Sequence, residues 1–202
     1  MAMAEPLEFY FDFSSPYAYL ASEQIDALAA RYGRQVKWRP ILLGVVFKAT
    51  GSAPLTEIPL KGDYSRRDFD RSARFLGLPF CFPSKFPLPT QAAARAYYWL
   101  HQQDCAQARA FAHAVFRALF VHDRDISDTA VVTELAVQAG ADPAALAAAI
   151  QSEEIKARLR QECDTAIARG VFGAPFIFID GEPFWGADRL PQIERWLAQG
   201  GF

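Results

Sequence analysis

The sequence predicts an α/β domain that a long all-helical insertion interrupts. Three observations carry this prediction: residues 7–43 have the pattern of a strand, a helix and a second strand, residues 44–169 are mostly alanine-rich and periodic, and residues 170–202 have the pattern of two strands and a helix. The chain has 202 residues, of which 51% are hydrophobic and 22% are charged. This composition is typical of a globular protein, and the length suits one compact unit.

The first segment begins with a strand. Leu7–Phe13 places large apolar residues at alternate positions, which is typical of a strand. Ser15 and Pro16 follow, and they suit the N-cap and the first position of a helix because a proline there loses no intrahelical hydrogen bond. We expect this helix to run to about Tyr32. Val36–Leu43 is apolar, partly β-branched and bounded by turn residues, so it predicts a second strand.

The middle segment predicts a bundle of helices. Residues 44–60 are rich in glycine and proline and predict an irregular connection. The periodic segments that follow predict helices over residues 64–76, 90–102, 106–121, 128–139, 143–150 and 153–169.

The last segment predicts a hairpin and a closing helix. Phe176–Ile179 and Glu182–Trp185 flank Asp180-Gly181, a dipeptide that favours a tight hairpin turn. A helix is expected from about Asp188 to Gln199. Without the helical block, the order of elements is that of a thioredoxin domain. We therefore expect a discontinuous thioredoxin-like domain at residues 1–46 and 170–202, and a helical insertion domain at residues 47–169.

Composition and patterning argue against several classes of protein. The net charge of -2 gives no extended positive field for a nucleic acid. No apolar run is long enough for a membrane-spanning helix, and the first eight residues lack the pattern of a secretory signal, so a cytoplasmic protein is expected. The three cysteines and three histidines have no metal-ligand spacing, so neither a disulfide framework nor a metal site is expected.

The turn between the first strand and the first helix carries the sharpest chemical signal. In a thioredoxin frame the redox C-P-x-C motif stands here, whereas this chain has Ser15-Pro16-Tyr17-Ala18 and therefore no protein thiol for disulfide exchange. Free backbone N–H groups, the positive end of the helix dipole and the Ser15 hydroxyl would suit a thiolate that a ligand supplies. The alternative is that Ser15 only caps the helix, which is a common role of serine.

Two segments near the C-terminus add to this signal. Pro175 begins a predicted strand, and in a thioredoxin frame this proline is cis, so that the backbone of Ala174 faces the helix start and can pair with an extended ligand. Trp185-Gly186-Ala187-Asp188-Arg189 forms the turn before the last helix. Asp188 either caps that helix or meets an ammonium group, and free N–H groups in the turn suit a carboxylate.

Five motifs in this order resemble a known family. F-Y-F-D-F-S-S-P-Y-A-Y-L, F-K-A-T-G, K-G-D-Y, G-V-F-G-A-P-F-I-F-I-D-G-E and F-W-G-A-D-R are similar to those of the 2-hydroxychromene-2-carboxylate isomerases and the kappa-class glutathione transferases. The resemblance covers essentially the whole chain. It implies a thioredoxin domain with a helical insertion, a homodimer, and glutathione as a required cofactor.

The resemblance also implies roles for individual residues. Ser15 matches the serine that activates the glutathione sulfur, and Ala174 and Pro175 match the segment that pairs with the cysteinyl backbone. Lys61 matches a lysine near glutathione. The turn that binds the γ-glutamyl end is matched by Trp185, Gly186, Ala187 and Asp188. The organic substrate site is matched by Lys48, Ser52 and Phe86, although Ser52 stands where the family has asparagine and Phe86 replaces a tyrosine.

The function implied is that of a glutathione-dependent isomerase of aromatic degradation. Such an enzyme interconverts 2-hydroxychromene-2-carboxylate and trans-o-hydroxybenzylidenepyruvate, so the expected substrate is a small aromatic carboxylate. Two alternatives stay open at this point. One is a kappa-like glutathione transferase that conjugates small electrophiles, and the other is a non-catalytic thioredoxin-fold protein that binds glutathione.

Overall fold

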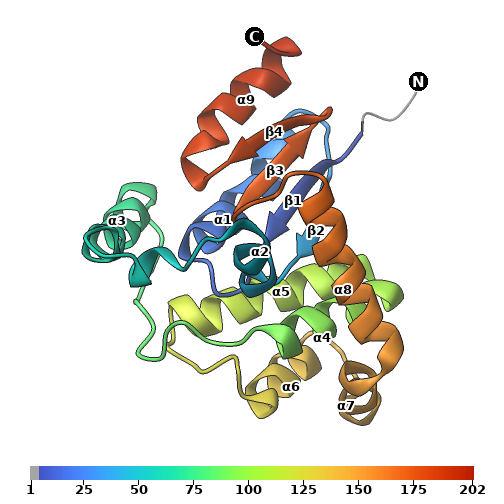
Figure 1. Ribbon diagram of the computed structural model, residues 1–202. Helices are drawn as coiled ribbons and strands as arrows, with labels where there is room; N and C mark the ends of the chain where they lie inside the picture. Colours follow the sequence, from blue (N-terminus) through green and yellow to red (C-terminus); the bar gives the residue numbers. More distant parts are fainter. Residues whose placement is uncertain (1–4) are drawn as a thin grey trace.

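A computed structural model describes residues 5–202 and confirms the predicted α/β fold with its helical insertion (Figure 1). Residues 1–4, where the first predicted domain segment and the stretch inspected for a secretory signal begin, lie outside the described residues. The sheet has the order β2-β1-β3-β4. Its strands are β1 (Leu7–Phe11), β2 (Val36–Pro40), β3 (Phe176–Ile179) and β4 (Glu182–Trp185). β2 is parallel to β1, β3 is antiparallel to β1, and β4 is antiparallel to β3.

The helices surround this small sheet on several sides. In Figure 1 the helix α9 lies at one end of the molecule, α6 and α7 lie at the opposite end, and α3 protrudes to one side. The two helices outside the insertion are α1 (Pro16–Arg31) and α9 (Leu190–Gln199). The helices between β2 and β3 are α2 (Leu43–Thr50), α3 (Lys61–Leu76), α4 (Gln91–Gln103), α5 (Cys105–Phe120), α6 (Thr129–Gln138), α7 (Pro143–Gln151) and α8 (Glu153–Ala168). Short 3-10 turns occur at η1 (Leu55–Glu57) and η2 (Ala187–Arg189).

The prediction for residues 36–60 is wrong in two respects. β2 ends at Pro40 rather than at Leu43, and the helix α2 replaces the first part of the predicted irregular connection. The short apolar run before Phe47 fits a strand or a helix equally well by pattern alone. The structure selects a helix by a long-range contact, because the N–H of Leu43 donates to the carboxylate of Asp12 at 2.7 Å. The expected domain boundary between residues 46 and 47 lies inside α2, and the division into two domains stays a prediction.

An aromatic cluster joins the sheet to the insertion. The ring of Phe11 on β1 lies 5.3 Å from that of Trp38 on β2, 5.4 Å from that of Phe116 on α5 and 6.2 Å from that of Tyr97 on α4. All four side chains are buried. Because each fully buried side chain of this size contributes about 1.5 to 3 kcal/mol, this contact fixes the end of β1 against the insertion. The chemistry-bearing turn that follows β1 is therefore held on a rigid base.

Candidate active site

The turn after β1 holds the Ser15 hydroxyl at the start of α1. Ser15 is the N-cap of α1, and its Oγ accepts a hydrogen bond from the N–H of Ala18 at 3.2 Å. The same hydroxyl donates to the carbonyl oxygen of Ala174 at 3.1 Å, although the two residues are 159 positions apart. A hydroxyl can rotate its hydrogen toward another acceptor. Ser15 therefore offers one donor at the positive end of a helix of sixteen residues.

The peptide bond between Ala174 and Pro175 is cis, which confirms the prediction for this proline. The carbonyl oxygen of Pro175 accepts a hydrogen bond from the N–H of Gly186 at 3.0 Å. This bond ties the segment opposite Ser15 to the turn after β4. Two predicted binding segments, which are separated by the β3–β4 hairpin, thus form one surface.

The turn after β4 exposes the carboxylate of Asp188. The side chain of Asp188 is 71% exposed and lies 3.4 Å from the guanidinium of its neighbour Arg189. It caps neither η2 nor α9, whose N-caps Gly186 and Arg189 make no side-chain cap hydrogen bond, so the capping interpretation of Asp188 is wrong. α9 begins at Leu190, because the residues expected to form its first turn form η2 instead.

One cleft of about 1690 Å³ contains nearly all of the predicted site residues. Those that line it are Ser15, Lys48, Ser52, Lys61, Phe86, Ala174, Trp185, Gly186, Ala187 and Asp188. Pro175 is buried and does not line the cleft. Segments from the start, the middle and the end of the chain therefore meet in one place, as a common site requires. The roles assigned to these residues stay predictions.

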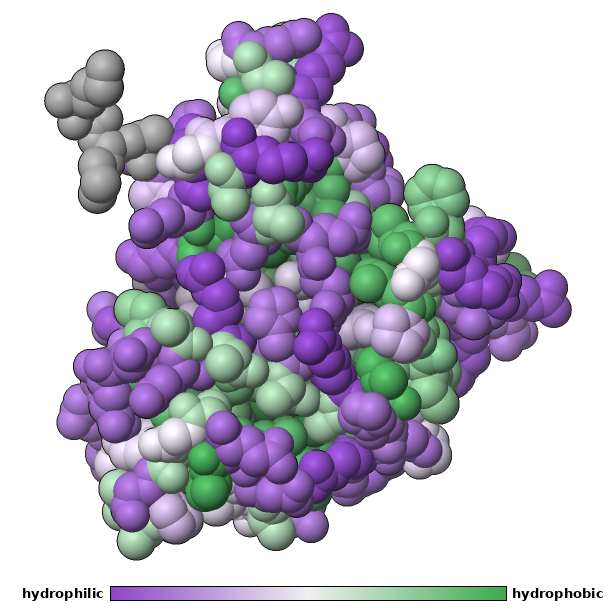
Figure 2. Space-filling model, turned by 180° about the vertical axis from the view of Figure 1, so that it is seen from behind, coloured by the Kyte–Doolittle hydropathy of each residue, from purple (hydrophilic) through white to green (hydrophobic). Residues whose placement is uncertain are grey.

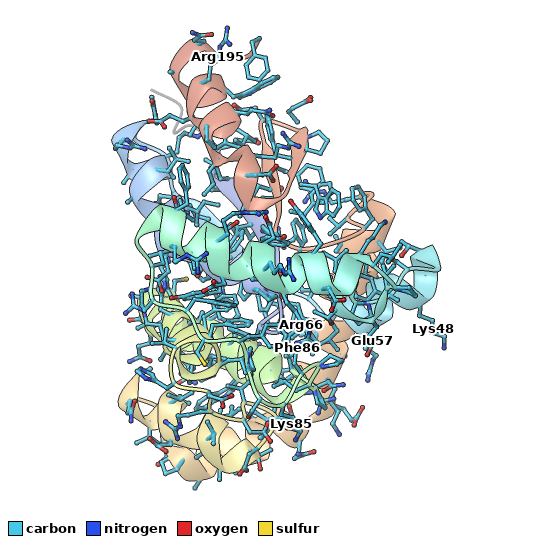
Figure 3. The ribbon with its side chains drawn as sticks, turned by 90° about the vertical axis from the view of Figure 1, so that its left-hand side faces the viewer. Lys48, Glu57, Arg66, Lys85, Phe86 and Arg195 are labelled. Carbon is cyan, nitrogen blue, oxygen red and sulfur yellow. The ribbon has the colours of Figure 1, made fainter. Side chains whose placement is uncertain are left out.

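The organic substrate residues of the prediction lie on two different walls. The ring centroids of Phe86 and Phe82 lie 5.0 Å apart. The guanidinium of Arg66 stacks over the Phe82 ring, 4.3 Å from its centroid. Figure 3 shows Arg66 and Phe86 close together below α3, whereas the side chain of Lys48 points away from the body of the protein. Lys48 is exposed and forms no ion pair with any described residue. Its long side chain must turn inward to reach a substrate.

α3 forms the outer wall of the cleft and is fastened to α1. The hydroxyl of Tyr17, two residues after Ser15, donates to the carboxylate of Asp68 at 2.6 Å, and its ring packs edge-on against Phe69 at 4.8 Å. Burial and the neighbouring carboxylate of Asp68 raise the pKa of Tyr17. Hydrophobic residues gather at the base of the protruding helix, at the right of Figure 2. Lys61, at the first position of this helix, is exposed at the edge of the cleft.

Several lining residues that the structure brings to the site were missed from sequence, among them Asp12, Asp68 and Thr90. Asp12 is a buried carboxylate at the end of β1, and an acidic residue inside an otherwise apolar strand end is a signal that could have identified it. Asp68 and Thr90 lie in ordinary polar positions of helical segments. Nothing in their local pattern distinguishes them from solvent-exposed residues.

The cysteines are not part of the cleft lining, although the Cys163 sulfur accepts a hydrogen bond from the N–H of the lining residue Leu42 at 3.3 Å. Cys81 and Cys105 are exposed, Cys163 is buried, and none of the three lines the cleft. Burial raises the pKa of the Cys163 thiol to about 11. In residues 5–202 no group of three or more His, Cys, Asp or Glu side chains is arranged to hold a metal ion. Within the same range no helix has the length and apolar character that crossing a membrane requires.

Comparisons with known proteins agree with this architecture. A family model described as a DSBA-like thioredoxin domain matches residues 6–198. A 2-hydroxychromene-2-carboxylate isomerase of Sphingobium xenophagum is 34% identical over 96% of this chain and 99% of its own length. A kappa 2 glutathione S-transferase of Caenorhabditis elegans is 28% identical over 96% of this chain and 92% of its own.

A solved structure supports the same relationship. The structure of a 2-hydroxychromene-2-carboxylate isomerase superposes with a TM-score of 0.87 and 29% sequence identity, and the match covers 96% of this chain and 94% of the other. The similarity therefore extends over the sheet and the helical insertion alike.

Proposed function

Since the chain belongs to the DSBA-like thioredoxin domain family, and within it to the 2-hydroxychromene-2-carboxylate isomerases, we propose that it is a glutathione-dependent isomerase. Its substrates would be 2-hydroxychromene-2-carboxylate and trans-o-hydroxybenzylidenepyruvate. The observation that carries the proposal is the position of the Ser15 hydroxyl, which stands at a helix N-terminus and contacts Ala174 inside the common cleft. A homodimer and a cytoplasmic location stay predictions.

The residues present fit glutathione in charge and in shape. Asp188 offers an exposed carboxylate to an ammonium group, and Lys61 offers an exposed ammonium group to a carboxylate. Gly186 has φ 112°, and a Cβ atom built there would collide with the carboxylate of Asp188. With the Asp188 side chain in this position, only glycine fits at residue 186, and the turn can then approach a ligand closely. The backbone of Ala174, Ser15 and the turn from Trp185 to Asp188 would hold the tripeptide.

Glutathione would supply a thiolate, which is both a good nucleophile and a good leaving group and can make a conjugated double bond temporarily single. Ser15 would donate its hydroxyl hydrogen to the sulfur instead of to Ala174. The N-terminus of α1 would stabilise the negative charge, as helix N-termini do for anions. Lys48, once turned inward, would balance the carboxylate of the substrate or the charge that develops during the reaction.

The second candidate is a kappa-like glutathione transferase, which the 28% identity to a protein of that name favours. The two reactions differ in what happens to glutathione. Isomerisation leaves its concentration unchanged, whereas conjugation consumes one molecule per turnover. The test incubates the protein with 2-hydroxychromene-2-carboxylate and with 1-chloro-2,4-dinitrobenzene, and follows product absorbance together with free thiol. Absence of glutathione-dependent interconversion of the first compound would reject the proposal, and calorimetric binding of glutathione without either reaction would indicate a binding protein.

Replacing Asp188 by asparagine is expected to weaken glutathione binding about 10- to 100-fold. The change removes a charge-assisted hydrogen bond, which typically contributes about 1.5 to 3 kcal/mol. Turnover at saturating glutathione should change little, because Asp188 belongs to the end of the site that is remote from Ser15. Calorimetry gives the dissociation constant and initial rates give kcat. An unchanged dissociation constant would remove Asp188 from the binding site.

The variant in which all three cysteines are replaced by serine, Cys81→Ser, Cys105→Ser and Cys163→Ser, is expected to retain glutathione-dependent turnover within about threefold. None of these cysteines lines the cleft, so the reacting thiol must come from the ligand. Serine is used at position 163 because its hydroxyl can still accept the hydrogen bond that the N–H of Leu42 donates to the Cys163 sulfur at 3.3 Å. Loss of turnover in a folded variant, judged by circular dichroism, would contradict a chemistry that needs only the glutathione thiol.

A further inference from the structure

Asp12 is a buried carboxylate that the proposed reaction does not use. Its side chain lies at the end of β1, is only 3% exposed and borders the cleft. One carboxylate oxygen accepts hydrogen bonds from the N–H and the hydroxyl of Ser14 and from the hydroxyl of Thr90, each at 2.9 Å. The other oxygen accepts from the N–H of Leu43 at 2.7 Å. The carboxylate therefore accepts four hydrogen bonds, three on one oxygen and one on the other, and all four partners are donors, as an ionised carboxylate requires.

The partners of Asp12 stand at the starts of three helices. Thr90 is the N-cap of α4, but its hydroxyl donates to Asp12 and makes no cap hydrogen bond within its own helix. Leu43 is the first residue of α2, whose N-cap Leu42 has no side chain that can accept. The backbone carbonyl of Asp12 also accepts from the N–H of Ser15, the N-cap of α1, at 2.9 Å. The positive ends of α1, α2 and α4 thus converge on one residue, and helix N-termini favour a negative charge.

Each of these helices carries a different part of the proposed site. α1 begins at the Ser15 hydroxyl, α2 carries Lys48, and the loop with Phe86 enters α4 at Thr90. The side chain of Asp12 bonds to Leu43, to Thr90 and to Ser14, which directly precedes the N-cap of α1, and no other described side chain links these three segments by hydrogen bonds. A rigid connection between them would fix the distance from the cofactor thiol to the organic substrate. A displacement of about 1 Å between reacting groups can cost about 100-fold in rate.

We propose that Asp12 is a positioning residue: its carboxylate holds the start of α2 and the Phe86 loop in register with Ser15, so that the thiolate and the organic substrate meet. The inference rests on the proposed function, because it assigns these two walls to the two reactants. Asp12 itself touches neither reactant. Its effect is transmitted through Leu43, Ser14 and Thr90.

The charge of Asp12 supplies a readout that separates this role from mere stabilisation. Burial raises the pKa of Asp12, and the four hydrogen bonds to its carboxylate oppose that rise. Its negative charge also contributes to the raised pKa of Cys163 on α8, after the larger effect of burial. A negative charge so close to Ser15 would likewise raise the pKa of a thiolate held there. Removing it while keeping the backbone bond to Ser15 should lower that pKa.

The decisive variant is Asp12→Asn. The asparagine oxygen can keep the bonds to Ser14 and Thr90, but its amide nitrogen would face the N–H of Leu43, donor against donor, and release the start of α2. We expect kcat to fall about 10- to 100-fold and KM for the organic substrate to rise. The dissociation constant of glutathione should stay within about threefold, and the thiolate absorbance of the bound glutathione should titrate at lower pH. General loosening of the site would instead shift that titration upward, because Ser15 would lose its alignment.

Two further variants complete the test. Glu162→Gln is the matched control, because Glu162 is also a buried carboxylate and pairs with Arg39 at 2.9 Å, yet it does not line the cleft. It should leave kcat and the thiolate titration unchanged. Thr90→Val removes one hydrogen-bond donor to Asp12 and keeps the Asp12 charge. It therefore tests the connection between Asp12 and the start of α4 even if Asp12→Asn fails to fold. We expect a several-fold lower kcat and an unchanged affinity for glutathione.

The outcomes distinguish the inference from the function on which it rests. Wild-type protein without glutathione-dependent isomerisation would reject the proposed function. Active wild type, together with kcat and KM that stay within twofold in folded Asp12→Asn and in Thr90→Val, would overturn the positioning role. An upward shift of the thiolate titration, or an equal loss of activity in Glu162→Gln, would overturn it as well.

Discussion

Replacing Ser15 by alanine is expected to lower turnover about 10²- to 10³-fold, which is the usual cost of removing one preorganised donor from a developing or bound anion. Glutathione should still bind, because Ala174 and the turn from Trp185 to Asp188 are untouched. The Ser15 hydroxyl is buried at 5% exposure and has one donor hydrogen, which in the free protein points to Ala174. Without that donor, the thiolate depends on the α1 N-terminus alone, and its pKa should rise.

The same substitution removes a helix cap, so its effect on stability must be separated from its effect on chemistry. Loss of a serine N-cap costs about 0.5 to 2 kcal/mol of folding free energy. Ser152 provides the control, because it caps α8, a helix of the same length as α1, by accepting from the N–H of Ile155 at 3.3 Å. Ser152→Ala should lose a similar amount of stability and no activity per folded molecule.

The measurement for both variants is the thiolate absorbance of the glutathione complex against pH, combined with turnover per folded molecule. In Ser15→Ala the thiolate of bound glutathione should titrate at higher pH than in wild type. In Ser152→Ala it should titrate at the same pH as in wild type. Superimposable curves and equal turnover for Ser15→Ala and wild type would leave Ser15 as a helix cap.

The segments around Ser15 and Pro175 were predictable because their signals are local. A strand pattern followed by Ser15-Pro16 fixes the start of α1, and Asp180-Gly181 fixes the β3–β4 hairpin. A thioredoxin-like order then places Pro175 opposite Ser15, as the hydrogen bond from Ser15 to Ala174 confirms. These predictions required only the residues next to each turn and the order of strands and helices along the chain.

Features that depend on distant contacts were not predictable. α2 forms where its first N–H meets Asp12, which lies 31 positions earlier in the chain. The apolar run after Pro40 carries no local signal that selects this helix over a strand. The same reason explains why Asp12 and Thr90 were missed, since neither residue has a special role until the three helix starts are brought together.

Asp188 illustrates the remaining ambiguity. An aspartate just before a helix pattern is most often an N-cap, so sequence alone allows a capping role and a binding role. The structure removes the capping role because η2 precedes α9 and the carboxylate stays exposed. Whether Asp188 caps the helix or faces a ligand depends on the φ angle of Gly186, which no sequence pattern specifies.

Gly186 therefore carries the second large effect that we expect. Gly186→Ala should weaken glutathione binding by at least about 100-fold, which is more than Asp188→Asn alone. Its φ of 112° and ψ of 148° lie close to a region that is essentially restricted to glycine, where other residues cost about 1 to 3 kcal/mol. The added Cβ would also collide with the carboxylate of Asp188, so the backbone, the carboxylate or both must move. A backbone shift would disturb the turn that the N–H of Gly186 ties to Pro175, and a rotation of the exposed Asp188 side chain would move the carboxylate away from its binding position.

Gly200→Ala is the matched control for backbone strain. Gly200 also has a positive φ, 75°, but a Cβ there would meet no atom within 4 Å, and the residue does not line the cleft. Both variants should therefore lose folding free energy in urea denaturation, while only Gly186→Ala should lose glutathione affinity in calorimetry. If the two glycine variants bind glutathione equally well, the turn after β4 is not the γ-glutamyl site. Gly186→Ala could bind glutathione weakly while its kcat at saturating glutathione stays near that of wild type. That result would show that the turn binds glutathione and that Ser15, in another part of the same cleft, acts on its sulfur.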